Sequence, residues 1–364
     1  MLKQSIVSLL MEVKALGASD LLLTAGAAPQ IRLRGVLQAL DHDLLNQDEI
    51  KKLVDELINE RQRILLETYK ALDFSKSIEG VAKFRFNAYF QRGSLALAGR
   101  IIPDKIPSRL DLGIPSIAEE FANHSSGLVL VTGPAGSGKS TTLAVMVNYI
   151  NSKKKLHIIT VEDPIEYEHS HIESIVDQRE IGSDADSFAD ALRSIFRQSP
   201  DVIMVGELRD LETIRLALTL AETGHLILAT LHTQDTTHAI SRIVDVFPAE
   251  QQQQIYFQLS QVLIGVLAQQ LIMTTAQNRL VLACEVMRVT PGISNLIREM
   301  KTEQIYSMIQ SGRAEGMITM NDSLRELLDL GLIHRQAALS KTAKPKELLR
   351  MIDEASARKN GGKV

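Results

Sequence analysis

Residues 126–150 read SGLVLVTGPAGSGKSTTLAVMVNYI, a stretch that specifies three consecutive elements. Leu128–Thr132 is a short apolar run rich in β-branched side chains, which indicates a buried strand. The octet Gly133–Ser140 follows at once and matches the phosphate-loop pattern G-x-x-x-x-G-K-[ST]. Thr141–Ile150 then has helical composition and spacing. A strand, a glycine-rich loop and a helix in this order predict a nucleotide-binding site.

The residue types of this loop fit the chemistry of phosphate binding. Glycines let the backbone bend so that successive N–H groups point into one nest, and the helix N-terminus adds partial positive charge. Lys139 can reach the β- and γ-phosphates, and the Ser140 hydroxyl can bind Mg²⁺. We therefore expect ATP and Mg²⁺ as ligands. The residues expected to contact the nucleotide are Gly133, Pro134, Ala135, Gly136, Ser137, Gly138, Lys139, Ser140 and Thr141.

Composition and charge are those of a soluble globular protein. The chain has 364 residues, of which 45% are hydrophobic and 23% charged. The net charge of −4 argues against a nucleic-acid-binding protein. The single cysteine, Cys284, permits no disulfide within the chain, and no apolar run approaches the roughly 20 residues of a membrane span. We therefore expect a cytoplasmic protein without a transmembrane segment.

The chain divides into regions with different patterns. Residues 1–103 mix helical stretches with strand-like runs and predict an α+β domain, and prolines mark residues 104–115 as a linker. Further on, strands alternate with helices, which is typical of an α/β fold with a parallel sheet. We place a nucleotide-binding core at 116–290 and a helical C-terminal part at 291–364. The strands expected in the core are Leu128–Thr132, Leu156–Val161, Val202–Val205 and Leu226–Thr230, with a later pair near Leu271–Thr274 and Arg279–Met287.

Two acidic residues stand directly after predicted strands. Phosphoryl transfer to water needs a group that positions the water and an acidic group at the metal. Both should lie at the carboxyl ends of the strands, facing the phosphate loop. Glu162 follows one strand and Glu207 follows another. A single carboxylate there is usually a helix cap or a solvated charge, but two in one nucleotide-binding fold predict functional groups.

Histidines and arginines supply further candidates. His225 and His232 flank the strand Leu226–Thr230, where they could contact the γ-phosphate or relay its presence. An arginine supplied across a subunit boundary can raise turnover by roughly 10³–10⁵. Several of the candidate arginines are expected to be ordinary surface ion pairs. The candidates are Arg85, Arg92 and Arg100 in the first domain and Arg193, Arg197, Arg209 and Arg242 in the second.

Several boxes resemble those of the secretion ATPases of the type II and type IV pilus class, over nearly the whole chain. The Asp box is matched by ITVEDPIEYEH at 159–169 and the atypical Walker B box by DVIMVGELRD at 201–210. The His box is matched by GHLILATLHT at 224–233 and SRIVDVFP at 241–248. The first-domain motifs are matched by GASDLLLTAG at 17–26 and FRFNAYFQRGSLALAGRIIP at 84–103.

The resemblance implies a PAS-like N-terminal domain joined to a RecA-like ATPase and assembled as a homo-hexameric ring. It implies that Glu162 is the catalytic glutamate and that Glu207 is the Walker B glutamate, which would bind the metal together with Ser140. His225 and His232 would be the His-box histidines. The arginines implied in phosphate or interface contacts are Arg85, Arg92, Arg100 and Arg242.

The resemblance is closest to the pilus-retraction branch, whose motors hydrolyse ATP to drive twitching motility. It implies a cytoplasmic motor at the inner-membrane pilus platform, with a paralogous ATPase as a further partner. Extension motors of the family carry a four-cysteine metal module, which a chain with Cys284 alone cannot build. Two departures leave open an accessory paralogue: residues 19–23 read SDLLL where the family has SDLHL, and residues 292–299 match the retraction signature only in part. A nucleic-acid translocase is a third reading, which would predict a basic loop.

Overall fold

The computed structural model describes residues 5–33, 35–102, 105–277 and 279–361, which fold as two compact units. The first unit comprises Met1–Lys105 together with Pro164–Glu168. The second comprises Ile106–Asp163 and His169–Val364. The last residue of the predicted first domain, 103, and the first of the predicted linker, 104, lie outside the described residues. Each unit is built around a β-sheet of its own.

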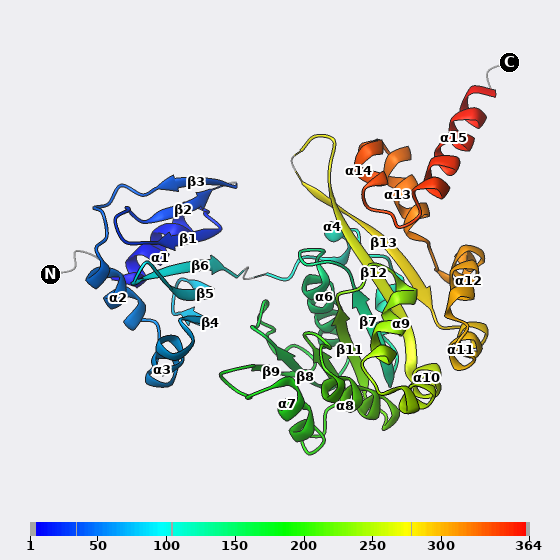
Figure 1. The fold of residues 1–364 in the computed structure, drawn as a ribbon, viewed down its shortest axis with the longest axis horizontal. Helices are drawn as coiled ribbons and strands as arrows, with labels where there is room; N and C mark the ends of the chain where they lie inside the picture. The colour runs from blue at the N-terminus through cyan, green and yellow to red at the C-terminus, as the bar shows by residue number, and fades with distance from the viewer. Residues whose placement is uncertain (1–4, 34, 103–104, 278, 362–364) are drawn as a thin grey trace. The chain divides into compact units, whose positions relative to one another are not determined.

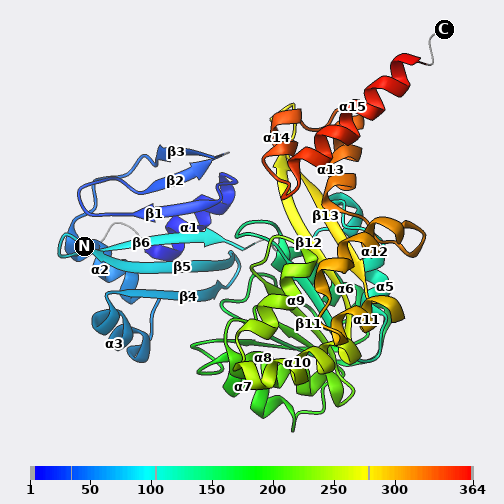
Figure 2. The same ribbon diagram turned by 45° about the vertical axis from the view of Figure 1, so that its right-hand side comes forward.

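The first unit contains a six-stranded antiparallel sheet with the order β3-β2-β1-β6-β5-β4 (Figure 2). Its helices pack against one face, because apolar residues of all three share one core with the strands. The strands are β1 (Asp20–Leu23), β2 (Gln30–Leu33), β3 (Val36–Ala39), β4 (Ala71–Ile78), β5 (Ala82–Gln91) and β6 (Ser94–Ile101). The helices are α1 (Ile6–Ala15), α2 (Gln47–Asp55) and α3 (Glu60–Tyr69).

Buried and exposed side chains alternate along the first part of β5. Phe84, Phe86 and Ala88 are buried, whereas Arg85 between the first two is exposed. Successive side chains of a strand point to opposite faces, so Arg85 lies on the face away from the helices. The same sheet therefore provides an apolar core on one side and a charged surface on the other.

The second unit contains a seven-stranded sheet with the order β13-β12-β7-β11-β10-β8-β9. Strands β12 to β9 of this order run parallel, and β13 pairs with β12 in the antiparallel direction. This confirms the predicted α/β class and parallel sheet. The strands are β7 (Gly127–Thr132), β8 (His157–Glu162), β9 (Ile175–Glu180), β10 (Val202–Val205), β11 (Leu226–Leu231), β12 (Leu263–Met273) and β13 (Leu280–Arg288).

Helices cover both faces of this sheet (Figure 1). Leu128 and Leu130 of β7 pack with α7 to α10 on one face, and Val129 and Val131 pack with α5 and α6 on the other. The helices are α4 (Arg109–Leu112), α5 (Ile117–Ala122), α6 (Lys139–Lys153), α7 (Phe188–Ile195), α8 (Leu211–Glu222), α9 (Thr236–Asp245), α10 (Ala249–Val262), α11 (Pro291–Arg298), α12 (Ile305–Ser311), α13 (Met320–Asp329), α14 (Arg335–Leu339) and α15 (Pro345–Gly361). Two 3-10 turns lie at Thr302–Gln304 and Arg313–Glu315.

Strand β13 carries two buried residues with polar side chains. Cys284 has a relative exposure of 3%, and burial raises the pKa of its thiol to about 12. The neighbouring Glu285 is equally buried, and its carboxylate accepts hydrogen bonds from the backbone N–H groups of Thr236 and Met320. These two residues are the first of α9 and of α13, so one carboxylate binds the N-termini of two helices.

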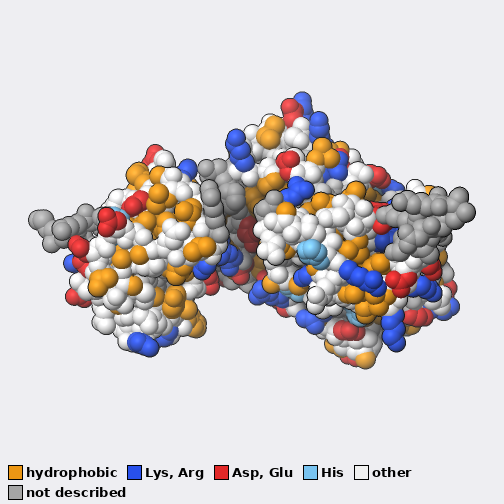
Figure 3. Space-filling view, turned by 90° about the horizontal axis from the view of Figure 1, so that it is seen from above, with side chains coloured by type: hydrophobic (Ala, Val, Ile, Leu, Met, Phe, Trp, Pro, Cys, Tyr) orange, Lys and Arg blue, Asp and Glu red, His pale blue; other side chains and the backbone are white. Residues whose placement is uncertain are grey.

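The described helices include none that combines the length and the apolar character required to cross a membrane. On the face shown in Figure 3, lysine and arginine side chains are interspersed with aspartate and glutamate. The surface on this side is therefore mixed in charge.

Candidate nucleotide-binding and catalytic site

The loop between β7 and α6 has a backbone that requires glycine. Gly133, Gly136 and Gly138 have φ angles of 144°, 74° and 87°, in the region that other residues rarely adopt. A Cβ atom at Gly133 would lie 2.4 Å from the backbone oxygen of Gln269. No described side chain caps the N-terminus of α6, which begins at Lys139. The helix therefore directs its N-terminus, which favours an anion, toward the loop.

Lys139 lies across this loop with a relative exposure of only 8%. Its Nζ atom donates to the backbone oxygens of Gly133 and Pro134, each at 3.0 Å. The hydroxyls of Thr132 and Ser137 are buried beside it and have no hydrogen-bond partner among the described residues. An ammonium group, unpaired hydroxyls and backbone N–H groups suit the oxygens of a nucleotide phosphate.

Three predicted site residues lie at the carboxyl ends of strands beside β7. The sheet order places β7, β11, β10 and β8 side by side, all parallel. His232 follows β11, Glu207 follows β10, and Glu162 is the last residue of β8. The phosphate loop follows β7 at the same edge. The fold thus gathers side chains that are up to 93 residues apart in the sequence, as for Lys139 and His232.

A row of polar contacts joins these side chains. The Nδ1 atom of His232 lies 3.5 Å from Nζ of Lys139, and its Nε2 atom lies 3.3 Å from Oε2 of Glu207. The other carboxylate oxygen of Glu207 pairs with Nη2 of Arg209 at 2.6 Å. Because an ammonium can only donate, Nδ1 of His232 accepts and Nε2 carries the proton toward Glu207. His232 therefore links Lys139 to Glu207 through one hydrogen bond on each side of its ring.

Glu162 lies in a more enclosed position, with a relative exposure of 5%. Its Oε1 atom accepts a hydrogen bond from Oγ1 of Thr160 at 2.7 Å and another from Nε2 of Gln178 at 3.1 Å. Sequence reasoning did not identify Thr160 or Gln178. Gln178 belongs to β9, which was not predicted, so the sequence carried no signal that it stands beside Glu162.

His225 lies at the opposite end of β11 from the phosphate loop. It precedes the six-residue strand that His232 follows, which places the two histidines on the order of 20 Å apart. Its Nδ1 atom lies 3.0 Å from the backbone oxygen of Leu220, and its own oxygen accepts from Gly127 N–H. The structure therefore places His232 beside the phosphate loop of the same chain and His225 away from it. Arg242, in the last turn of α9, is exposed.

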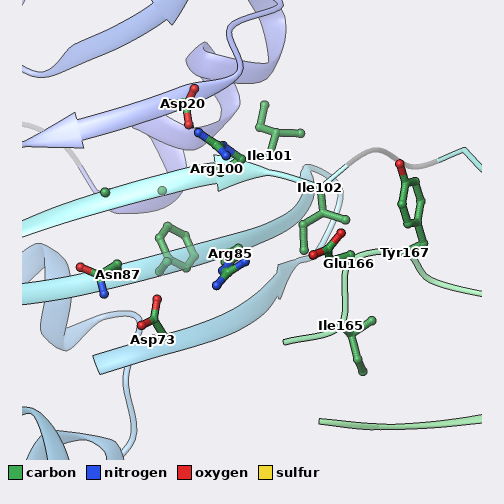
Figure 4. A pocket seen from close by; sticks show the side chains of 13 residues that line it. Asp20, Asp73, Arg85, Asn87, Arg100, Ile101, Ile102, Ile165, Glu166 and Tyr167 are labelled. Atoms are coloured by element: carbon green, nitrogen blue, oxygen red, sulfur yellow. Dashed lines mark hydrogen bonds and ion pairs between the residues drawn. The ribbon is translucent and has the colours of Figure 1, made fainter. Parts of the chain in front are cut away.

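Arg85 and Arg100 face a cavity of about 320 Å³ in the first unit (Figure 4). They are direct cross-strand partners on β5 and β6, and Nε of Arg100 donates to Oδ1 of Asp20 at 2.7 Å. The side chain of Arg85 has no hydrogen bond or ion pair within the part of the chain that the structure describes. Arg92 occupies the turn between these strands, with a φ of 47°, and does not line the cavity. The structure therefore brings together two of the three predicted arginines.

His169 begins the part of the second unit that follows residues 164–168. Burial lowers the pKa of its imidazole to about 4. Neither ring nitrogen has a hydrogen-bond partner among the described residues. Its backbone N–H donates to Oε1 of Gln178 at 2.8 Å. His169 is therefore a neutral buried side chain whose backbone is linked to the glutamine beside Glu162.

Comparison with known proteins finds relatives that match most of the chain. A family model described as type II/IV secretion system protein matches residues 115–359. The type IV pilus retraction ATPase PilT of Pseudomonas aeruginosa is 46% identical over 329 residues, which cover 90% of this chain and 95% of that protein. The type IV pilus ATPase PilU of the same organism is 38% identical over 336 residues, covering 92% and 88%.

The fold has a solved counterpart. A crystal structure of the pilus retraction motor PilT with bound ADP superposes with a TM-score of 0.90 and 46% identity, covering 96% of this chain and 100% of that one. The phosphate loop, the strand-end residues and the family match all point to one assignment. The chain belongs to the type II/IV secretion system protein family.

Proposed function

We propose that the chain is a motor that hydrolyses ATP, acts as a homo-hexamer, and drives type IV pilus retraction. The observation that carries the ATPase proposal is the convergence of Lys139, His232, Glu207 and Glu162 at the carboxyl ends of neighbouring parallel strands. The direction of movement is proposed from the name of the relative at 46% identity, a pilus retraction ATPase.

Each residue has a distinct role in this proposal. The N–H groups of the loop bind the phosphates, and Lys139 neutralises the charge that develops on the transferred group. Oxygen atoms of ATP would replace the carbonyls of Gly133 and Pro134 as acceptors for its ammonium. Glu162 orients the attacking water and accepts its proton. His232 connects the phosphate end of the site to Glu207.

The site also offers groups of the kind that Mg²⁺ prefers. Ser140 is half-buried at the start of α6, and the Glu207 carboxylate has a side-chain exposure of 12%. A hydroxyl and a carboxylate, completed by phosphate oxygens, are typical Mg²⁺ ligands. We propose that Ser140 and Glu207 hold the ion, which when bound supplies positive charge at the phosphate oxygens.

The ATPase proposal is tested with purified protein. Wild type should release phosphate from Mg-ATP, whereas Lys139→Ala should abolish turnover. Glu162→Gln keeps the shape of the side chain and should retain nucleotide binding while losing turnover. Native mass with and without Mg-ATP checks the proposed hexamer. Hydrolysis by Lys139→Ala at the wild-type rate would refute the assignment of the site.

The direction of the motor requires a separate test in cells. A deletion strain should keep or gain surface pili while losing twitching movement. A strain without pili that regains them on complementation would contradict retraction and leave the ATPase proposal intact. We further propose that the protein works at the cytoplasmic side of the inner-membrane pilus platform.

An accessory paralogue of the main motor is the alternative function. The 38% identity to PilU and the SDLLL sequence at residues 19–23 support it. An accessory motor would restore twitching only when the main retraction ATPase is also present. Complementation of strains that lack one or both motors separates the two functions. The mixed charge of the surface in Figure 3 offers no support for a nucleic-acid translocase.

A further inference from the structure

Gln178 of β9 is placed to control the orientation of Glu162. In the parallel pair of β8 and β9, Thr160 is the register partner of Gln178 and Glu162 is the partner of Glu180. Gln178 is therefore diagonal to Glu162 on the same face, a separation that a long side chain can span. Its Nε2 atom reaches Oε1 of Glu162 at 3.1 Å.

The amide of Gln178 has only one orientation that satisfies its neighbours. The backbone N–H of His169 lies 2.8 Å from Oε1 of Gln178 and can only donate. The amide oxygen must therefore face His169, and the NH₂ group must face the carboxylate of Glu162. This identifies the NH₂ group as a donor to Glu162, a direction that distances alone do not establish for an amide.

Two donors converge on one oxygen of the carboxylate. Oγ1 of Thr160 lies 2.7 Å from Oε1 of Glu162, the atom that Gln178 also contacts. Donors to a carboxylate favour its ionised form. Their convergence on Oε1 also fixes the rotation of the carboxyl group, and with it the direction in which Oε2 points. A general base needs both an ionised carboxylate and a fixed direction.

We propose that Gln178 is a positioning residue that keeps Glu162 ionised and oriented to accept a proton from the attacking water. This inference rests on the proposed role of Glu162 as the catalytic base. Gln178 acts through Glu162 and His169 N–H. Its specific chemical requirement is a side chain that donates at one end and accepts at the other.

The test compares a substitution that removes both the donor and the acceptor of the Gln178 side chain with one that keeps only an acceptor. Gln178→Leu removes the hydrogen bonds to Glu162 and to His169 N–H at similar side-chain size. Gln178→Glu keeps an acceptor for His169 N–H but places a second carboxylate against Glu162. The matched control is Asp177→Asn, the preceding residue on β9, whose side chain lies on the other face and contacts His157. Circular dichroism and native mass verify that each variant folds and assembles.

The readouts are kcat, KM for ATP and the pH dependence of kcat. Gln178→Leu should lower kcat on the order of 10-fold to 100-fold, with KM unchanged, because only the orientation of the base is lost. In both variants the acid limb of the pH profile should move upward by about one pH unit, more in Gln178→Glu, because the carboxylate is easier to protonate. Asp177→Asn should behave as wild type.

Glu180 and Glu207 are the titratable groups at the carboxyl ends of the strands that flank β8. The profiles are therefore also recorded with Glu180→Gln, in which a shift caused by Glu180 would disappear. Glu207 is left unchanged in every variant, because it is proposed to hold Mg²⁺. The movement of the acid limb should survive in the double variant of residues 178 and 180.

The possible failures are distinguishable. If Glu162→Gln hydrolyses ATP at the wild-type rate, the proposed base is wrong and the role of Gln178 falls with it. If Glu162→Gln is inactive but Gln178→Leu and Gln178→Glu keep the wild-type acid limb, only the positioning role is refuted. Should Gln178→Leu fail to fold, Gln178→Glu decides the result because it retains the bond to His169.

Discussion

The Nε2 atom of His232 lies 3.3 Å from Oε2 of Glu207, although the two residues follow different strands and are 25 residues apart. The Nδ1 atom on the other side of the ring faces Lys139. The imidazole thus occupies the space between the group expected to bind phosphate and the group expected to bind the metal. Its loss should disturb both.

His232→Ala should lower turnover on the order of 10-fold or more while nucleotide binding is largely kept, because the lysine and the glutamate lose their common partner. His225→Ala is the matched control, since that histidine lies at the far end of the same strand. It should leave turnover close to wild type. Phosphate release and binding of a non-hydrolysable ATP analogue are measured for both. Equal losses in the two variants would contradict the placement of His225.

Arg85→Ala should reduce the ATPase activity of the assembled protein. The Arg85 side chain is exposed on the face of its sheet away from the helices and has no described partner, whereas Arg100 pairs with Asp20. Arg85 is thus the better candidate to reach the phosphate on a neighbouring subunit. Arg92→Ala, outside the cavity, serves as the control and should have little effect.

Mixed assembly tests whether this arginine acts on a neighbour. In this proposal, rings made only of Lys139→Ala subunits are inactive and rings made only of Arg85→Ala subunits have reduced activity. Rings that contain both should recover part of the activity, because one junction then has an intact loop and an intact arginine. Absence of recovery over a range of ratios, with mixing verified by mass, would rule out action in trans.

His169 should make the protein less stable as the pH falls below 6.5. Its folded pKa is lowered by burial from 6.5 to about 4, so the unfolded chain binds more protons in this interval. The stability that the neutral histidine allows is therefore present above pH 6.5 and is lost as the pH falls through the folded pKa, by up to about 3 kcal/mol.

His169→Leu should flatten this dependence, since leucine cannot take up a proton. Urea midpoints between pH 7 and pH 4 provide the measurement, followed with a reporter in the second unit. His171→Leu, two residues along, is a control with an exposed side chain. The same pH slope in wild type and His169→Leu would show that another group is responsible.

Glu285→Ala should destabilise the second unit by about 2–4 kcal/mol, because several donors lose a buried acceptor. The Oε1 atom of Glu285 accepts from Thr236 N–H at 3.0 Å and from its hydroxyl at 2.8 Å, and Oε2 accepts from Met320 N–H at 3.3 Å. Glu303→Ala removes an exposed carboxylate that lines one cavity together with Glu285, and it should change stability by less than about 0.5 kcal/mol. Urea unfolding compares the two, and similar losses would contradict the role of the buried carboxylate.

The sequence predicted the candidate site residues that follow apolar strands, but it did not predict the residues that contact them. The phosphate loop, Glu162, Glu207 and His232 each come after a short β-branched run, and the parallel order of those runs then brings their ends together. The separation of His225 from the loop was also accessible, since a six-residue strand has a known length. Its place before the strand is sufficient to predict that it lies away from the loop of the same chain.

One strand and the first half of another escaped prediction for physical reasons. In β9 only Val176 is a buried apolar residue, so the strand lacks the alternation that marks a sheet element. The first half of β12, from Leu263 onward, is a continuous apolar run, which does not distinguish a strand from a buried helix. The grouping of Arg85 with Arg100 and Asp20 likewise depends on the order of strands in the sheet, which local patterns do not specify.

The burial of Cys284 has a practical consequence for fluorescent labelling of this protein. It is the only cysteine of the chain, and its thiol is buried with a pKa raised to about 12, so thiol-directed dyes will scarcely modify it. The native sequence is therefore a ready background for fluorescent labelling. One cysteine introduced on the surface of each unit would carry a donor and an acceptor dye, and energy transfer between them would report movements of the two units during ATP turnover.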